Sequence, residues 1–395
     1  MAASSTSSAS LGERVVVTVQ LSPGLIGFRC VRCDARQPIG DYFEGCPACD
    51  RAGSPASLAA EYGPTAPIDD EGRLPLRCPT YLGEGRTPLV PLPALAQALG
   101  LEGLWAKLES LNPTGSHKDR MSRFVVARAQ QLGFEGVVAA SSGNAGVSLA
   151  ATAARAGIGA TIITRRNAPG RWVDAIRVYG ATVIESPDAR ARWVETRRLV
   201  EAGRHYPATN FRSPPVGSNP FGVQGYKAVA YEIVDALGSR AADAIVVPTE
   251  RGDLLWGVFE GLRESQACGR LAAMPRLFAS EPYPRVVAVL DGADHRKSFT
   301  GASAQASIAG SSVTWQTLAA VKGSDGGAVV VGDRLAASSR RDLARFDITA
   351  ELCSTATLGA LRRLIADGTV ARGARVVLMI TADGALAADG AAARP

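Results

Sequence analysis

Lysine is scarce in this chain. Lysine and arginine together number 43 of 395 residues, but the lysines are confined to Lys107, Lys118, Lys227, Lys297 and Lys322. Arginine stays protonated near neutral pH, whereas a partly desolvated lysine can lose its proton and become a nucleophilic amine. The chain therefore offers few candidates for amine chemistry.

Three other features are missing as well. No long basic run or aromatic-interleaved patch accompanies the formal charge of +6, so we expect no nucleic-acid partner. No apolar run reaches the roughly 18–20 residues that span a bilayer, so we expect no membrane partner. The Ala/Ser-rich residues 1–13 lack the basic start and apolar core of a signal peptide, and we expect a disordered tail on a cytoplasmic protein.

The cysteines are few but clustered. Of seven, four form two Cys-x-x-Cys pairs near the N-terminus: Cys30, Cys33, Cys46 and Cys49. Two such pairs at this separation can surround one zinc ion with four thiolates, which leaves no coordination position for water and makes the zinc structural. The alternative is four reduced thiols or two redox pairs. Residues 51–79, rich in Pro, Gly and acids, are expected to form a linker.

Short apolar runs alternate with amphipathic stretches from about Tyr81 onward. The runs predict strands at 136–140, 160–164, 181–185, 244–248, 285–290 and 375–381. Helical patterns lie between them at 120–132, 145–156, 172–179, 225–237, near 255–264, and at 355–366. This alternation predicts an α/β architecture with mostly parallel sheets.

Lys118 stands out among the lysines. It ends the small-residue segment from Asn112 to His117 and directly precedes a predicted helix. A lysine between a loop and a helix start, flanked by Ser, Thr and His, is a candidate Schiff-base lysine. The alternative, an exposed lysine at a helix N-terminus, places a cation at the positive end of the helix dipole, where it is disfavoured.

Three strand-to-helix junctions carry candidate chemistry. Residues 141–146 read Ser-Ser-Gly-Asn-Ala-Gly and can bind an anion such as a carboxylate, although a plain helix cap is the alternative. Residues 248–254 stand where a phosphate would bind, yet they hold one glycine and two acids, so a plain loop is the alternative. Thr381 follows a strand at the edge where open α/β sheets bind ligands.

Taken together, these pieces resemble the fold-type II pyridoxal-phosphate enzymes, and within them threonine synthase and its relatives. The resemblance covers roughly residues 30–389 and is collinear. Beyond the cysteine pairs and the three junctions, the matching segments are 84–89, 112–120, 219–221, 224–227, 351 and 354–357.

The resemblance implies a tryptophan synthase β-like fold: two three-layer α/β domains with the cofactor in the cleft between them. It implies a zinc-ribbon-like segment at 14–55, a large cofactor-binding domain formed by 56–118 and 215–395, and a small domain at 119–214. It also implies a homodimer, with pyridoxal 5'-phosphate and a structural zinc ion as cofactors.

The resemblance also assigns residue roles. Lys118 is expected to be the catalytic residue and to bind the cofactor covalently. The other expected cofactor-binding residues are Asn144, Thr249, Arg251, Gly252, Asp253, Thr381 and His117. The expected substrate-binding residues are Ser141, Ser142, Gly143, Ala145 and Thr114.

The implied reaction is elimination or replacement at Cβ or Cγ of an amino-acid substrate, as in threonine synthase. The alternatives are a serine/threonine deaminase, a β-replacement synthase acting on a serine-like substrate, and a non-catalytic binding protein. Two departures bear on this choice. Glu250 and Leu254 stand where the family commonly has glycine, and Gly222 stands where threonine synthase commonly has a phosphate-binding arginine.

Overall fold

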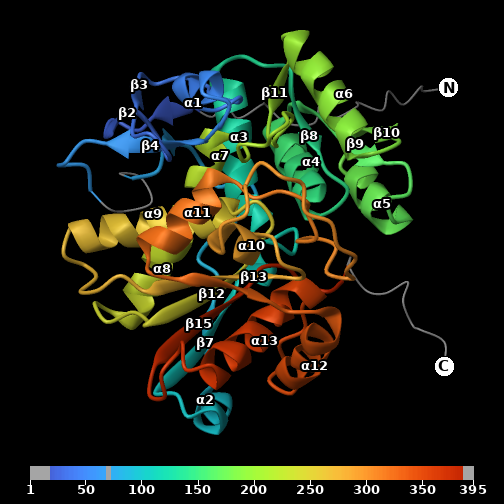
Figure 1. Cartoon of the computed structure of the whole chain (residues 1–395). Coiled ribbons are helices and arrows are strands. Elements are labelled where there is room, and N and C mark those ends of the chain that lie inside the picture. Colours follow the sequence, from blue (N-terminus) through green and yellow to red (C-terminus); the bar gives the residue numbers. More distant parts are fainter. Residues whose placement is uncertain (1–17, 68–72, 386–395) are drawn as a thin grey trace, which may run out of the picture.

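The computed structural model describes residues 18–67 and 73–385. The tail expected at residues 1–13 lies outside these ranges. Within them the strands form three larger sheets and one small pair, in which β1 (Gln20–Leu21) runs antiparallel to β5 (Leu76–Arg77). Figure 1 shows the largest sheet in the lower half of the molecule and the other two above it.

The N-terminal cysteines lie on and around a small antiparallel sheet. Its order is β3 (Arg36–Gln37), β2 (Leu25–Cys30) and β4 (Leu58–Tyr62), and the short helix α1 (Pro47–Arg51) packs beside it. Cys30 ends β2, Cys33 is in the turn after it, and Cys46 and Cys49 are at α1. The expectation of a linker over 51–79 is therefore wrong in part. Leu58–Tyr62 pairs with β2 because its mostly buried residues complete that sheet.

A parallel four-stranded sheet lies at the upper right in Figure 1. Its order is β10 (Thr182–Ser186), β9 (Gly159–Arg165), β8 (Gly136–Ala140) and β11 (His205–Pro207). The associated helices are α3 (Lys118–Gln131), α4 (Asn144–Ala156), α5 (Gly170–Val178) and α6 (Ala189–Glu201). Because all the strands are parallel, their carboxyl ends meet at one edge.

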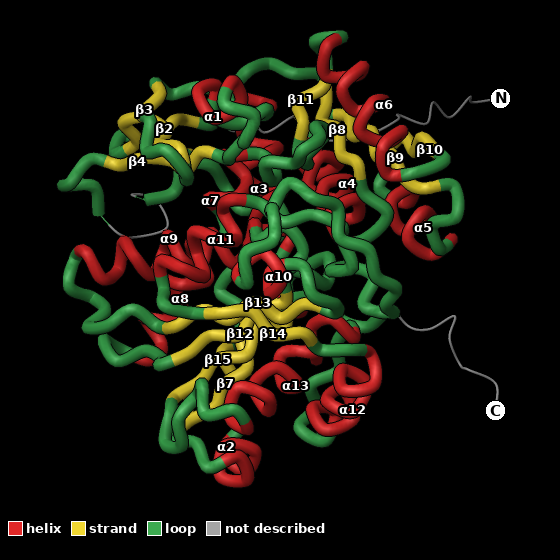
Figure 2. The backbone as a smooth tube through the Cα atoms, in the orientation of Figure 1, coloured by secondary structure: helices red, strands yellow, loops and turns green. Residues whose placement is uncertain are grey.

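The six-stranded sheet has helices on both faces (Figure 2). Its order is β14 (Gly327–Val330), β13 (Arg276–Glu281), β12 (Ala244–Pro248), β15 (Arg375–Ile380), β7 (Gly103–Leu108) and β6 (Leu89–Pro91), and only β6 is antiparallel to its neighbour. One face packs against α2 (Pro93–Leu99), α12 (Asp333–Ala344) and α13 (Leu352–Ala366). The other packs against α8 (Lys227–Leu237), α9 (Asp253–Ala267) and α11 (Trp315–Gly323).

Side chains of the central strands alternate between two hydrophobic cores. Along β12, Ile245 and Val247 join one core, whereas Ala244 and Val246 join the other. Burial on both faces explains why this strand reads as a continuous apolar run rather than as an alternating pattern. Short elements complete the description: η1 (Glu109–Leu111), α7 (Pro220–Gln224) and α10 (Val286–Leu290).

Most predicted elements are confirmed, with bounds shifted by a few residues, but the strand predicted at 285–290 is wrong. Residues Val286–Leu290 form α10, and the strand lies earlier, at β13. The Glu281 carboxylate accepts the backbone N–H groups of Arg285, Val286 and Val287 at 2.9–3.1 Å. This side chain satisfies the free donors of a helix start, which an apolar run alone does not reveal.

Among the residues described, no helix combines the length and the apolar character needed to cross a membrane.

Candidate active site

Lys118 is the first residue of α3, and the turn before it is held from both sides. Asp119 accepts hydrogen bonds from the backbone N–H of Thr114, at 2.7 Å, and from its hydroxyl. The backbone N–H of His117 donates to the Thr381 carbonyl at 2.9 Å. The lysine turn is thus attached to the end of β15. Thr114, expected to bind substrate, donates its hydroxyl to Asp119.

The amine of Lys118 differs from those of the other two buried lysines. Burial lowers the pKa of Lys107, Lys118 and Lys227 alike. Lys107 pairs with Glu232, and Lys227 lies 2.8 Å from Glu264. Within the described residues, by contrast, the Nζ of Lys118 makes no hydrogen bond or ion pair, and it lies 5.8 Å from the ring centroid of Tyr226.

This pattern excludes the reading of Lys118 as an ordinary exposed lysine. Its side chain is partly buried, and burial is the chief cause that lowers its pKa. A desolvated amine without a carboxylate partner is the form that reacts as a nucleophile.

The loop after β8 uses its two serines differently. The hydroxyl of Ser141 accepts the N–H of Gly146, in the first turn of α4, at 3.0 Å, whereas the plain alternative was a helix cap by Ser142 or Asn144. The hydroxyl of Ser142 accepts the N–H of Arg165 at 2.9 Å and Nη1 of Arg192 at 3.4 Å. Gly143 then precedes Asn144 and Ala145 in the first turn of α4, where the backbone N–H groups can hold an anion.

Asn144 is oriented by a buried carboxylate that sequence reasoning gave no role. Its amide Nδ2 donates to Oε1 of Glu351 at 2.8 Å, while the Ser307 hydroxyl and the Cys353 thiol donate to Oε2 at 2.8 and 3.0 Å. Because the amide nitrogen is committed to Glu351, the amide oxygen of Asn144 is left to accept a hydrogen bond. The charge of Glu351 also reaches Lys118: it partly offsets the lowering of the lysine pKa by burial. Glu351 and Lys118 therefore belong to one site.

In the 249–254 loop before α9, three successive backbone carbonyls accept hydrogen bonds from neighbouring side chains. Arg285 donates to the carbonyls of Thr249, at 2.8 Å, and Glu250, at 3.1 Å. The Arg251 carbonyl accepts from Thr314, at 2.7 Å, and Gln316, at 3.0 Å. In a trans peptide the next N–H points opposite to the carbonyl. The N–H groups that follow these anchored carbonyls therefore point away from the anchors, as a phosphate cradle requires.

Glu250 and Leu254 stand where the family commonly has glycine, and the backbone of the loop does not require glycine at either position. Of residues 249–254, only Gly252 has a positive φ, at 76°, so glycine is not needed at the other positions. A Cβ at Gly252 would lie 2.1 Å from the Thr317 hydroxyl. The loop keeps the one glycine that its path demands.

The two acids of this loop are occupied by neighbours. Asp253 accepts hydrogen bonds from the N–H and hydroxyl of Ser218, at 3.1 and 2.6 Å, and from Gln316. Glu250 pairs with Arg251 at 3.2 Å. The hydroxyl of Thr249 donates back to the Val247 carbonyl at 2.9 Å. What the loop offers an anion is therefore chiefly backbone N–H groups. The Glu250 carboxylate is paired with a cation, and the Asp253 carboxylate is held by neutral donors.

Thr381 presents a hydroxyl rather than a carboxylate at the end of β15. Its Oγ1 lies 2.9 Å from the hydroxyl of Ser354, on α13. Beside it, Nδ1 of His117 lies 3.1 Å from the Thr381 carbonyl. Burial and the neighbouring Lys118 hold the pKa of His117 well below its usual value, so this ring is neutral and Nδ1 donates.

Gly222 cannot be replaced by any larger residue without rearrangement. A Cβ there would lie 2.6 Å from Val125 and 2.8 Å from Met121, both on α3. The arginine that the resemblance leads one to expect here has no space. The guanidinium of Arg212 is engaged with the N-terminal segment: it pairs with Asp50 at 2.6 Å and donates to the Glu44 carbonyl.

The four N-terminal cysteines form a second candidate centre. Their sulfur atoms all lie within 4.8 Å of one another, with 3.6 Å between Cys30 and Cys49 and 3.8 Å between Cys33 and Cys46. Sulfurs placed tetrahedrally around zinc, at 2.3 Å from it, are about 3.8 Å apart. The spacing fits one zinc ion and is too long for a disulfide, in which the sulfurs are about 2.05 Å apart.

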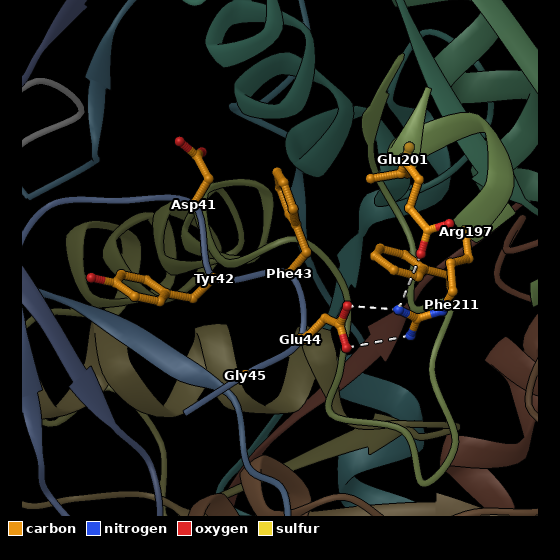
Figure 3. Close-up of a pocket in the computed structure, with 9 residues that line it drawn as sticks. Asp41, Tyr42, Phe43, Glu44, Gly45, Arg197, Glu201 and Phe211 are labelled. Carbon is orange, nitrogen blue, oxygen red and sulfur yellow. Dashed lines mark hydrogen bonds and ion pairs between the residues drawn. The ribbon is translucent and has the colours of Figure 1, made fainter. Parts of the chain in front are cut away.

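The segment from β2 to β4, which carries the four cysteines, is called the cysteine ribbon below. A surface pocket of about 340 Å³ lies between this ribbon and α6. Figure 3 shows Glu44 of the ribbon paired with Arg197 of α6 there, with Phe211 close by. None of the expected catalytic, cofactor-binding or substrate-binding residues lines it. This pocket therefore belongs to the junction between ribbon and α6 rather than to the Lys118 site.

Comparison with known proteins agrees with the site. A sequence model of the family described as "Pyridoxal-phosphate dependent enzyme" matches residues 80–382. The threonine synthase of Methanosarcina acetivorans is 28% identical over 378 residues, which cover 89% of this chain and 90% of that protein. The threonine synthase of Mycobacterium tuberculosis is 30% identical over 337 residues, covering 83% and 88%.

Solved structures share the fold. Threonine deaminase isoform 2 from Solanum lycopersicum has a TM-score of 0.65 at 19% identity and covers 77% of this chain and 85% of its own. A fungal L-serine ammonia-lyase from Rhizomucor miehei has a TM-score of 0.65 at 22% identity, with coverages of 76% and 94%. At these identities the likeness concerns the fold.

Proposed function

Because the chain belongs to the family of pyridoxal-phosphate-dependent enzymes, we propose that it catalyses elimination or replacement at Cβ or Cγ of an amino-acid substrate, with Lys118 as the residue that binds the cofactor. One observation carries the proposal: the unpaired, desolvated amine of Lys118 lies near two strand-to-helix junctions, before α4 and before α9, that offer backbone N–H groups, and its turn is bonded to Thr381 at the end of β15. Threonine synthase is the nearest named activity, supported by relatives 28–30% identical.

Each part of the site fits one part of the cofactor. The N–H groups of the 249–254 loop would hold the phosphate, the amide oxygen of Asn144 the phenolic oxygen, and the hydroxyl of Thr381 the pyridine nitrogen. When bound, pyridoxal phosphate supplies a ring that withdraws electrons from the substrate Cα. A neutral hydroxyl at the ring nitrogen, rather than a carboxylate, moderates this withdrawal and favours elimination and replacement.

The protein's own residues would then position the substrate and move its protons. The first turn of α4, from Gly143 to Ala145, would hold the α-carboxylate. Lys118, a buried amine with a lowered pKa, would take the proton from the substrate Cα and return it. Glu351 would act indirectly, by fixing the amide of Asn144.

A deaminase or β-replacement synthase for a serine-like substrate is the second candidate. The packing at Gly222 favours it, because no phosphate-binding side chain can stand at that position. Release of ammonia and a 2-keto acid from serine or threonine would identify a deaminase. Release of phosphate and threonine from O-phosphohomoserine would identify a threonine synthase.

The experiment that tests the proposal replaces Lys118. The purified protein should be yellow, and Lys118→Ala should lose the visible band of the lysine-bound cofactor, with turnover reduced at least about a thousandfold because the proton carrier is removed. Lys322→Ala, at an exposed lysine, is the matched control and should keep both. A protein that stays colourless when pyridoxal phosphate is added would refute the enzyme and leave a binding protein.

We also propose that Cys30, Cys33, Cys46 and Cys49 hold a structural zinc ion, supported by the sulfur spacing. The sheets support the division of the body into two domains. The strands of the four-stranded sheet fall within 136–207, inside the small domain at 119–214. Those of the six-stranded sheet fall within 56–118 and 215–395. The homodimer remains a prediction.

A further inference from the structure

The segment 224–227 is matched by the family resemblance, yet the proposed function gives none of its residues a role. Tyr226, directly before α8, lies beside the Lys118 site. Its ring centroid is 5.4 Å from that of His117, and the Nζ of Lys118 lies 5.8 Å from the same centroid. The tyrosine ring therefore borders the space around the Lys118 amine.

Tyr226 also packs against the start of α9. A Cβ at Gly257 would lie 2.4 Å from the Cβ of Tyr226. Gly257 follows Asp253 by about one helical turn, so both residues lie on the same face of α9. The charge of Asp253 has the largest effect of any charge on the pKa of Tyr226. Tyr226 thus lies between the lysine turn and the loop whose backbone N–H groups can hold an anion.

The hydroxyl of Tyr226 has no hydrogen-bond partner within residues 18–67 and 73–385, although the side chain is 0% exposed. A buried hydroxyl without a partner costs free energy, so such a group usually has one. Burial, followed by the charge of Asp253, holds the pKa of Tyr226 well above its usual value. The hydroxyl therefore keeps its proton and can donate it to an acceptor.

Pyridoxal phosphate has an acceptor that can reach this hydroxyl. Its aldehyde and its phosphate arm are on neighbouring ring carbons, so a molecule bonded to Lys118 would extend its phosphate toward the 249–254 loop. Tyr226 is in contact with both ends of that path. A phosphate presents three acceptor oxygens, and it can therefore take a side-chain donor in addition to the backbone N–H groups of the loop.

We propose that the hydroxyl of Tyr226 donates a hydrogen bond to the phosphate of the cofactor. The tyrosine would then make the site prefer pyridoxal phosphate to pyridoxal, which has the same ring and aldehyde but a neutral hydroxyl in place of the phosphate. Because the protein itself offers the hydroxyl no acceptor, this group should stabilise only the cofactor-loaded protein. The inference rests on the proposed function, since it concerns the cofactor of the same site.

Titration of the cofactor-free protein with pyridoxal phosphate and with pyridoxal, followed by visible absorbance, tests this inference. Tyr226→Phe keeps the ring and removes only the hydroxyl. It should weaken pyridoxal phosphate roughly ten- to hundredfold, the value of a hydrogen bond to a charged group, while pyridoxal changes less than about threefold. The melting temperature of the cofactor-free variant should equal or exceed that of the wild type, because a buried hydroxyl without a partner is removed.

Tyr62→Phe is the matched control, because it makes the same chemical change at another buried tyrosine. Tyr62 is in β4, its hydroxyl likewise has no hydrogen-bond partner in the described part of the chain, and its ring centroid lies 4.1 Å from the Nζ of Lys227. This tyrosine contacts a different lysine, so the variant should leave the affinities for pyridoxal phosphate and for pyridoxal unchanged.

Three results would overturn the inference. Equal affinity of Tyr226→Phe and the wild type for pyridoxal phosphate would mean that the hydroxyl meets water instead of the phosphate. Equal weakening of both ligands, or a melting temperature below that of the wild type, would assign the hydroxyl to the cofactor ring or to the architecture. Both of these results leave the proposed function intact. If the wild type takes up neither ligand, the proposed function fails, and the inference fails with it.

Discussion

At the scale of single residues, neighbouring groups set the backbone conformation of Gly252 and the charge of His117. Gly252 turns the chain into α9 with a positive φ and lies against Thr317. His117 is kept neutral by burial and by the adjacent Lys118, with its ring against Tyr226, 5.4 Å between centroids. Both can be tested by small substitutions.

Gly252→Ala should lower the free energy of unfolding by more than about 2 kcal/mol, because it adds a steric clash to the roughly 1–2 kcal/mol cost of a left-handed non-glycine residue. It should also weaken cofactor binding. Gly269→Ala is matched, since Gly269 follows the same helix with φ 78° and open space around it. It should cost only about 1 kcal/mol and leave cofactor affinity unchanged. Urea unfolding and cofactor titration measure both, and equal losses would contradict the expected contact with Thr317.

His117 should make the protein sensitive to acid. Its pKa in the folded state lies below its unfolded value of 6.5, so only the unfolded state gains a proton as the pH falls through about 6.5. Stability from this residue is complete above pH 6.5 and is lost as the pH falls toward the folded pKa. His117→Asn keeps a donor for the Thr381 carbonyl and should reduce the difference between urea midpoints at pH 7.5 and 5.5. An unchanged difference would show that other groups carry the acid sensitivity.

At the scale of elements, α8 and α9 are joined by a buried ion pair. Lys227 lies 2.8 Å from Glu264, and the Tyr231 hydroxyl donates to the same carboxylate. A Cβ at Gly261 would lie 2.6 Å from the Lys227 carbonyl, so the helices pack closely there. The pair thus fixes how α9, which begins at the 249–254 loop, is placed.

Lys227→Met should lower the free energy of unfolding by about 3–5 kcal/mol, because it leaves the Glu264 carboxylate buried without its cation. Adding Glu264→Gln should restore part of the loss. Arg240→Gln breaks an exposed pair with Glu102, 3.0 Å apart, and should cost less than about 1 kcal/mol. Similar losses in Lys227→Met and Arg240→Gln, measured by urea unfolding, would refute a structural role for the buried pair.

At the scale of the whole molecule, the cysteine ribbon contacts helices associated with both larger sheets. Asp41 pairs with Arg128 of α3 at 2.7 Å, and Glu44 with Arg197 of α6 at 2.8 Å. On the other side, Ser54 accepts Nε1 of Trp315, at the start of α11, at 3.1 Å. Asp41 and Glu44 lie between the two cysteine pairs, and Ser54 follows the second pair. The positions of these three residues therefore depend on how the ribbon itself folds.

We therefore expect the metal to stabilise the whole chain. Elemental analysis of protein purified without chelator should find one zinc ion per chain, and Cys30→Ser should lose it and unfold at a lower temperature. Cys268→Ser, at an exposed cysteine outside the cluster, should keep both the zinc and the melting temperature. Wild-type protein without zinc would refute the ribbon as a metal site.

The elements could largely be predicted because their signals are local. The apolar runs at 136–140 and 244–248 are confirmed as β8 and β12. The run at 285–290 failed because Glu281 caps a helix there through a side chain from the preceding strand. The helix α6 gave no usable pattern, since it carries few buried residues.

The sequence by itself determined the fold class, the family and which residues could carry the chemistry. Strand-to-helix junctions and paired cysteines are motifs of residues close together in the sequence, so they can be recognised without the fold. Only the tertiary structure decided how those residues are used. Glu351 meets Asn144 across 207 positions, and Arg285 anchors the loop at 249–250 from beyond the next strand. Whether Lys118 has an ion-pair partner depends on which carboxylates the fold brings near it, and no local pattern contains that information.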